Sequence, residues 1–191
     1  MTSPAGPANA GRKRADAERN RDRILTAARA AFADPEADVS MIEIARRSGV
    51  GSATLYRNFA SRRDLLEALY TGEIDAVCEA AAMATGATPG TAFTAWLHRF
   101  YAYITSKRAI AAELLQQATE DDPVFGTGLA RVLGASRPLL RAAQKSGEVR
   151  AGLTIEQILD MVGAIAQIPG NPGYRAPILQ AALDGLRPAR D

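Results

Sequence analysis

The segment Arg-Ser-Gly-Val-Gly-Ser-Ala-Thr-Leu-Tyr-Arg-Asn-Phe, residues 47–59, decides the fold of this chain. It predicts the end of one short helix, a tight glycine turn and a second short helix. The first helix is expected over Met41–Arg47, behind Ser40, which forms a Ser-x-x-Glu capping box with Glu43. Gly49 stands where the chain must reverse, a position that favours a left-handed residue. Two helices joined in this way are typical of a helix-turn-helix.

The predicted second helix, which begins near Ser52, has two different faces. Leu55 and Phe59 lie four residues apart on one face and are its large apolar side chains. Ala53 and Arg57 point the opposite way. In a helix-turn-helix this outward face meets DNA, where arginine binds guanine bidentately. A solvent-exposed helix that only buries its two apolar residues fits the same periodicity, so periodicity alone leaves both interpretations open.

The identities of the residues in this segment favour the interpretation that the outward face binds DNA. Gly-Val-Gly-Ser-Ala-Thr-Leu-Tyr-Arg-Asn-Phe at 49–59, followed by Ser-Arg-Arg-Asp-Leu-Leu at 61–66, resembles the DNA-binding domain of TetR/AcrR-family transcriptional regulators. Ile-Glu-Ile-Ala-Arg-Arg at 42–47 and Asn-Arg-Asp-Arg-Ile-Leu-Thr-Ala-Ala at 20–28 match that family as well. The resemblance covers residues 19–70 closely and extends beyond them only in helix pattern and length.

This resemblance implies an all-α fold with a DNA-binding part and a second helical part. We expect a disordered basic arm over residues 1–14, a helix-turn-helix DNA-binding domain over 15–62, and an effector-binding and dimerisation domain over 63–191. The implied partner is double-stranded DNA with a palindromic operator, bound by a homodimer. The implied function is a ligand-responsive repressor that releases its operator when a small apolar molecule binds the second domain.

The DNA contacts follow from the outward face of the second helix and its neighbours. Arginine reads base edges, whereas hydroxyl and amide groups also suit phosphate oxygens. The residues expected at base edges are Ser52, Ala53, Thr54 and Arg57, and those expected at phosphates are Ser40, Tyr56, Asn58 and Arg62.

Charge is distributed unevenly along the chain. Residues 1–63 hold 12 Lys and Arg against 7 Asp and Glu, whereas residues 64–191 hold 11 against 14. The basic part is the part that carries the helix-turn-helix, as expected for a DNA-binding domain. The cluster Arg12-Lys13-Arg14 fits either an arm near the phosphates or a plain tail.

Composition indicates a cytoplasmic protein without export signals. The single cysteine, Cys78, excludes an internal disulfide and fits a reducing compartment. The first 15 residues lack the apolar segment of a signal peptide. No run of about 18 apolar residues occurs, so we expect no contact with a membrane.

Helical periodicity predicts nine helices, and no strand pattern competes with it. The helix that follows the motif begins at Ser61 and is expected to be the only continuous element that links the two domains. A second capping box, formed by Thr154 and Gln157, opens a later helix. The predicted helices cover residues 15–33, 41–47, 52–59, 61–82, 88–104, 110–115, 122–146, 154–168 and 174–186.

An aromatic row in the second domain is a candidate effector site. Its spacing places the side chains on one side of a helix, where they pack as ordinary core, and the family resemblance adds that this region encloses an effector cavity. Both interpretations stay open at this stage. The candidate ligand-binding residues are Phe93, Trp96, Phe100, Tyr103, Gln116, Gln117 and Met161.

The last two predicted helices are the expected dimer interface, as the resemblance implies. They carry more apolar surface than one edge of a domain needs, although packing within the monomer is an alternative. The candidate interface residues are Ile155, Ile158, Leu159, Val162, Ile165, Ala166, Ile178, Leu179, Ala182 and Leu186.

Catalysis finds no support in the sequence. The chain has one histidine and one cysteine, and it lacks a glycine-rich phosphate loop and a metalloprotease motif. We therefore predict no catalytic residues, no metal site and no cofactor. Two alternatives to the ligand-responsive repressor remain: a DNA-binding regulator controlled by a partner protein, and, more remotely, an all-helical enzyme.

Overall fold

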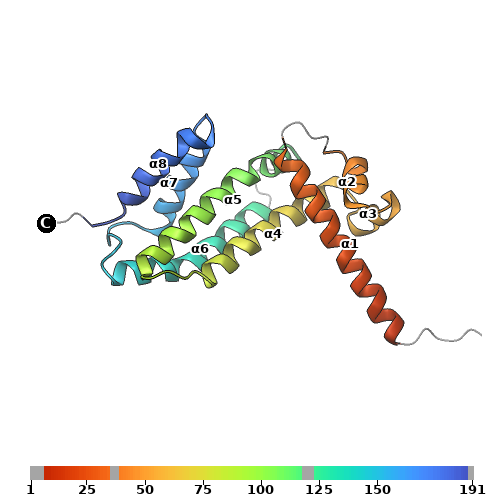
Figure 1. Cartoon of the computed structure of the whole chain (residues 1–191), viewed down its shortest axis with the longest axis horizontal. Helices are drawn as coiled ribbons and strands as arrows, with labels where there is room; N and C mark the ends of the chain where they lie inside the picture. The colour runs from red at the N-terminus through yellow and green to blue at the C-terminus, as the bar shows by residue number, and fades with distance from the viewer. Residues whose placement is uncertain (1–6, 35–38, 118–122, 189–191) are drawn as a thin grey trace, which may run out of the picture. The chain divides into compact units, whose positions relative to one another are not determined.

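The computed structural model describes residues 7–34, 39–117 and 123–188, which form eight helices and no strand. The all-α prediction is confirmed (Figure 1). No helix in these ranges is long and apolar enough to cross a membrane. The helices are α1 (Pro7–Ala33), α2 (Met41–Ser48), α3 (Ser52–Asn58), α4 (Arg62–Ala82), α5 (Pro89–Gln117), α6 (Pro123–Lys145), α7 (Ile155–Gln167) and α8 (Pro172–Asp184).

The described residues form eight helices, against about nine predicted, because α5 is continuous where the sequence predicts two helices. The sequence places a break after Ile104, yet the helix runs on through Thr105 and Ser106. Their hydroxyl groups donate to carbonyl oxygens of the preceding turn, those of Tyr101 and Tyr103 respectively. Short polar side chains that are satisfied in this way fit inside a helix instead of ending it.

The prediction of a disordered arm over residues 1–14 is also wrong from residue 7 onward. Helix α1 begins at Pro7, where the fixed φ of proline suits a first helical turn. Arg14 pairs with Glu18 one turn later, which supports the helix at its exposed start. Residues 1–6 and the side chains of Arg12 and Lys13 lie outside the described part.

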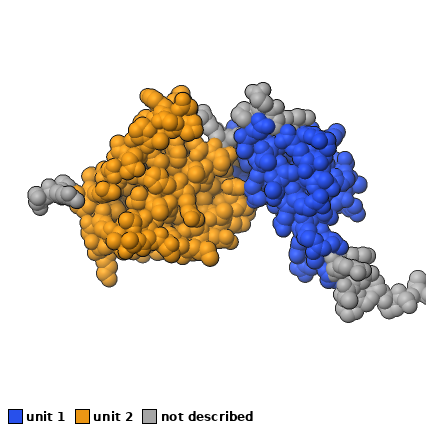
Figure 2. Space-filling view, in the orientation of Figure 1, with its two compact units in different colours: residues 1–70, 109–117 blue, residues 71–108, 118–191 orange. Residues whose placement is uncertain are grey.

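The chain packs into two compact units (Figure 2). Unit 1 holds residues 1–70 and 109–117, and unit 2 holds residues 71–108 and 118–191. Unit 1 therefore reaches past the expected boundary at residue 62 and takes in the end of α5. Helix α5, like α4, contributes to both units, so the expectation that the helix over 61–82 is the only continuous link is wrong.

Each unit has its own apolar core. In unit 1, Ile24 of α1 and Ile44 of α2 are fully buried together with Leu55 of α3. In unit 2, Trp96 of α5 and Ile158 of α7 are almost fully buried. Burial of such side chains is the dominant favourable contribution to folding.

Candidate nucleic-acid interface

The first helix of the motif starts at the predicted cap. Ser40 has extended backbone angles, and its hydroxyl oxygen accepts a hydrogen bond from the backbone N–H of Glu43 at 3.3 Å. This satisfies one of the N–H groups that a helix start leaves unpaired. The acceptor half of the predicted capping box is therefore confirmed.

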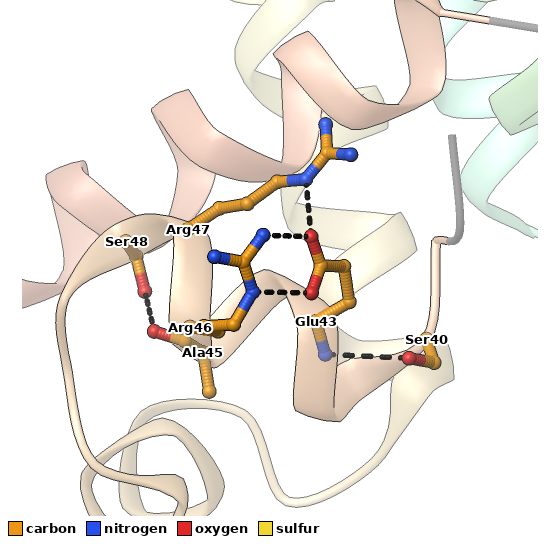
Figure 3. Close-up of polar contacts among 6 residues, drawn as sticks. All are labelled: Ser40, Glu43, Ala45, Arg46, Arg47 and Ser48. Carbon is orange, nitrogen blue, oxygen red and sulfur yellow. Dashed lines mark hydrogen bonds and ion pairs between the residues drawn. The ribbon is translucent and has the colours of Figure 1, made fainter. Parts of the chain in front are cut away.

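The Glu43 carboxylate has a second role that sequence reasoning missed. It accepts hydrogen bonds from Nε and Nη2 of Arg46, both at 2.7 Å, and from Nε of Arg47 at 2.8 Å (Figure 3). These hydrogen bonds, the Arg46 pair first, lower the pKa of Glu43 to about 2. The signal was available, because residues three and four apart on a helix are neighbours. One carboxylate thus orients two arginines on the surface of α2.

The turn between the two helices requires glycine. Gly49 has φ 65°, in the left-handed region, as predicted. Its N–H donates to the Arg46 carbonyl at 3.2 Å, and the next N–H, of Val50, donates to the Ala45 carbonyl at 3.2 Å. A Cβ at Gly49 would lie 2.7 Å from Nη2 of Arg23. The backbone conformation therefore specifies glycine, whereas the exposed end of Arg23 could move away from a small side chain.

Helix α3 presents the two faces that the sequence predicts. Leu55 and Phe59 are buried against unit 1, and Leu55 is inaccessible to solvent. The opposite side is open: Tyr56 is 50% exposed, and Ala53 and Arg57 are exposed as well. Helix α3 is therefore anchored by one face and leaves the other free to bind a large partner.

The outward face is pre-arranged by bonds along its own helix. Arg57 donates from Nε to the Ala53 carbonyl at 3.1 Å and from Nη2 to the Thr54 hydroxyl at 2.9 Å. Asn58 donates from Nδ2 to the Thr54 carbonyl at 2.8 Å. Of the predicted contact residues on α3, Ser52, Ala53, Tyr56 and Arg57 are exposed, whereas Thr54 and Asn58 are half-buried.

Helix α1 contacts the end of α3 through Arg21. The guanidinium of Arg21 lies 4.5 Å from the centre of the Phe59 ring, and its Nη1 donates to the Asn58 carbonyl at 3.4 Å. The first contact is a cation–π interaction, and the second satisfies a carbonyl at the helix end. Helix α3, the second helix of the helix-turn-helix and hereafter the recognition helix, is thus held in place by both its apolar face and its last residue.

Arg62, which the sequence predicts to bind a phosphate, is bonded to other residues of the protein. Its Nε and Nη2 both donate to the Glu113 carboxylate, and its Nη1 donates to the Val39 carbonyl. The guanidinium also lies 5.6 Å from the Phe32 ring centre. All three guanidinium nitrogens of Arg62 are therefore engaged within unit 1.

The aromatic row of α5 forms packed core in unit 2. Phe93, Trp96 and Phe100 are buried, with neighbouring ring centres 6.3 and 5.6 Å apart. Trp96 Nε1 donates to the Val77 carbonyl at 3.2 Å, and the half-buried Tyr103 accepts from Lys107 Nζ at 2.5 Å. The cavity that Trp96 lines measures only about 60 Å³. For these rings the core interpretation is the one that the geometry supports.

The remaining candidate ligand residues do not gather around that row. Gln116 is exposed and belongs to unit 1, and the side chain of Gln117 lies outside the described part. Met161 of α7 is half-buried. A larger space lies elsewhere in unit 2: an open groove of about 700 Å³, whose walls include Thr91, Thr94, His98, Glu148, Leu183 and Leu186.

The predicted dimer residues are mostly occupied inside the monomer. Both predicted helices form as α7 and α8, and the Thr154–Gln157 capping box is present in full. However, eight of the ten candidates are buried within the chain itself, and Ile178 and Ala182 are half-buried. The alternative of packing within the monomer is what the structure shows for the eight buried ones: Ile155, Ile158, Leu159, Val162, Ile165, Ala166, Leu179 and Leu186.

Two family models match the chain in succession. Residues 24–69 match the bacterial regulatory proteins of the tetR family, and residues 88–188 match the C-terminal domain of SbtR-like transcriptional regulators. The first match contains the helix-turn-helix, and the second covers more than half of the chain. No curated protein matches the chain.

Solved structures agree with these models. A TetR transcriptional regulator from Streptomyces coelicolor is 33% identical, with a TM-score of 0.74 over 89% of this chain and 99% of that one. A TetR regulatory protein from Mycobacterium vanbaalenii is 28% identical, with a TM-score of 0.74 over 91% of this chain and 98% of that one. With an anchored recognition helix, an exposed outer face and these relatives over nearly its whole length, the chain belongs to the TetR family of DNA-binding transcriptional regulators.

Proposed function

We propose that the protein is a cytoplasmic, sequence-specific repressor that inserts α3 into the major groove of its operator. The observation that carries this proposal is the exposed face of α3, with Tyr56 half exposed and Arg57 open, opposite the buried Leu55 and Phe59. A helix that is anchored on one side and polar on the other fits a groove about 12 Å wide.

The proposed roles divide between bases and backbone. Base edges meet Ser52, Ala53, Thr54 and Arg57, whereas Ser40, Tyr56 and Asn58 bind phosphates. To reach a guanine, Arg57 exchanges its intrahelical bonds to Ala53 and Thr54 for O6 and N7 of the base. Those bonds keep the side chain close to α3 before DNA arrives, which limits the rotamer freedom that binding removes.

The operator is palindromic in this proposal, because one short recognition helix reads few base pairs and a two-fold dimer supplies a second copy. Since eight of the ten predicted interface residues are buried within the monomer, the dimer uses the outer faces of these helices. Exposed side chains on those faces include Asp160, Ala164 and Gln167 of α7 and Tyr174, Pro177 and Ala181 of α8.

The proposed effector is a small, largely apolar molecule bound in unit 2. The 700 Å³ groove supports this choice of unit, since ligand pockets measure roughly 300–1,000 Å³. Its binding lowers operator affinity by moving α4 or α5, the helices that belong to both units. One observation favours the second candidate, a regulator controlled by a partner protein: the rings of Phe93, Trp96 and Phe100 are packed together as core.

The test is selection of a duplex from random DNA by the purified protein, followed by titration with Arg57→Ala. Loss of a bidentate guanine contact costs roughly 1–3 kcal/mol and relaxes the preference at one position. Tyr56→Phe is the control for a phosphate contact, and it weakens all duplexes about equally. Unchanged affinity and preference in Arg57→Ala would refute this assignment.

A further inference from the structure

Arg62 connects three elements of unit 1. It is the first residue of α4, and it donates from Nε and Nη2 to Glu113 near the end of α5, 51 residues away. Through Nη1 it holds the carbonyl of Val39, the residue directly before the Ser40 cap of α2. The start of the helix-turn-helix and the end of α5 therefore share one guanidinium.

The pairing with Glu113 excludes a phosphate from the same position. A carboxylate and a phosphate both bind arginine through two parallel N–H donors, and here Glu113 occupies the pair formed by Nε and Nη2. The side chains of Arg62 and Glu113 are 28% and 23% exposed, so the pair is shielded but open on one side. Operator phosphate and Glu113 thus compete for one cation.

The competitor sits on a helix that both units share. Residues 89–108 of α5 belong to unit 2 and include the buried Trp96, whereas residues 109–117 belong to unit 1 and include Glu113. No break separates them, because α5 is continuous from Pro89 to Gln117. A change that is felt by the unit 2 part of α5 therefore has a covalent helical path to the partner of Arg62.

We propose that Glu113 is a built-in competitor of the operator: Arg62 exchanges between the Glu113 carboxylate and a DNA phosphate, and the position of α5 sets the balance. The pair is closed in the structure without DNA and opens when phosphate takes its place. An effector that stabilises α5 in the pair-closed position lowers operator affinity. This inference rests on the proposed DNA-binding function and names α5 as the carrier of its regulation.

The test measures affinity for the duplex selected by the wild-type protein, across salt concentrations and without any effector. Glu113→Gln removes the competitor, so we expect roughly 3- to 10-fold tighter binding at 0.1 M salt. The slope of log K against log salt becomes steeper by about 0.9, because one more phosphate contact forms fully. Glu113→Asp keeps the charge but shortens the side chain, and it shifts affinity in the same direction.

A matched control separates pairing from simple loss of negative charge. Glu67→Gln removes the same charge from the Arg63–Glu67 pair on α4, which is similarly exposed. We expect a smaller gain from it. In an Arg62→Gln background, Glu113→Gln should gain no more than Glu67→Gln does, because the cation that it releases is gone. Circular dichroism of each variant checks that the helices are retained.

The outcomes distinguish this inference from the function on which it rests. A selection that yields no preferred duplex overturns both. If a duplex is selected but Glu113→Gln and Glu113→Asp bind it no more tightly than wild type, the competition is overturned and DNA binding stands. A gain that persists without Arg62 also overturns it, since the effect would then be general electrostatics.

Discussion

The helix-turn-helix of unit 1 and the helical core of unit 2 are both all-α. They differ in the sequence separation of the contacts that determine their structure. In the first, the turn at Gly49 and the cap at Ser40 depend on neighbours within a few positions. In the second, Trp96 lies against the backbone of Val77, 19 residues away on another helix. A DNA-reading element is specified locally, whereas a domain that encloses a core depends on distant partners.

The largest effect should come from removing the centre of the unit 2 core. Trp96 is 1% exposed and stacks between Phe93 and Phe100, so Trp96→Ala should lower the free energy of unfolding by about 3–5 kcal/mol. Urea unfolding followed by circular dichroism measures this loss. Trp96→Phe keeps a ring but loses the hydrogen bond to Val77, and a cost equal to that of alanine would contradict the packing argument.

A smaller and more local effect is expected in the turn of unit 1. Gly49→Ala places a side chain at φ 65°, which costs about 1–2 kcal/mol. Amide hydrogen exchange in α2 and α3 should become faster, while the unfolding transition of the single tryptophan, Trp96, stays in place. Gly51→Ala is the control, because that glycine has φ −70° and open space at Cβ. A shifted Trp96 transition would show that the units are not independent.

Unit 2 should respond to pH above neutrality through Lys107. This side chain is 4% exposed, and burial lowers its pKa to about 7 against the opposing influence of Glu73, Asp75 and Cys78. The unfolded chain then binds more protons than the folded one above that pH, so stability rises with pH. The urea midpoint of Trp96 fluorescence should increase from pH 7 to about 8.5. Lys107→Met should flatten this increase, whereas Cys78→Ala should keep it.

Unit 1 should respond at acid pH instead, with the smallest effect of the four. The pKa of Glu43 is lowered to about 2 by its bonds from Arg46 and Arg47, so its stabilising contribution is present above the unfolded pKa of about 4.3. It is lost as pH falls from there toward 2. Relative to the intrinsic exchange rate at each pH, the protection of the α2 amides should decrease over this range in the wild type and much less in Glu43→Gln. An identical acid profile in both proteins would show that protonation of Glu43 does not destabilise α2.

The relation of sequence to structure is clearest on α3 and α5. Leu55 and Phe59 could be assigned to the core because a spacing of four places them on one helix face, whatever they pack against. The break expected after Ile104 does not occur, because the hydroxyl groups of Thr105 and Ser106 donate to carbonyls of their own helix, which continues through them. Serine and threonine have low helix propensity, so local composition does not predict that a helix continues through them. The hydrogen bonds that their hydroxyl groups make show that it does.

The sequence alone determined the elements whose causes are local: the all-helical class, the capped start of α2, the left-handed turn at Gly49 and the two faces of α3. Periodicity, capping and backbone φ act over about four residues, so they can be read along the chain. Only the tertiary structure decided that Glu113 holds Arg62, that the aromatic row is packed, and that eight of the ten predicted interface residues are buried within the monomer. Each of these depends on which distant helix lies opposite, and the pattern along one helix does not contain that information.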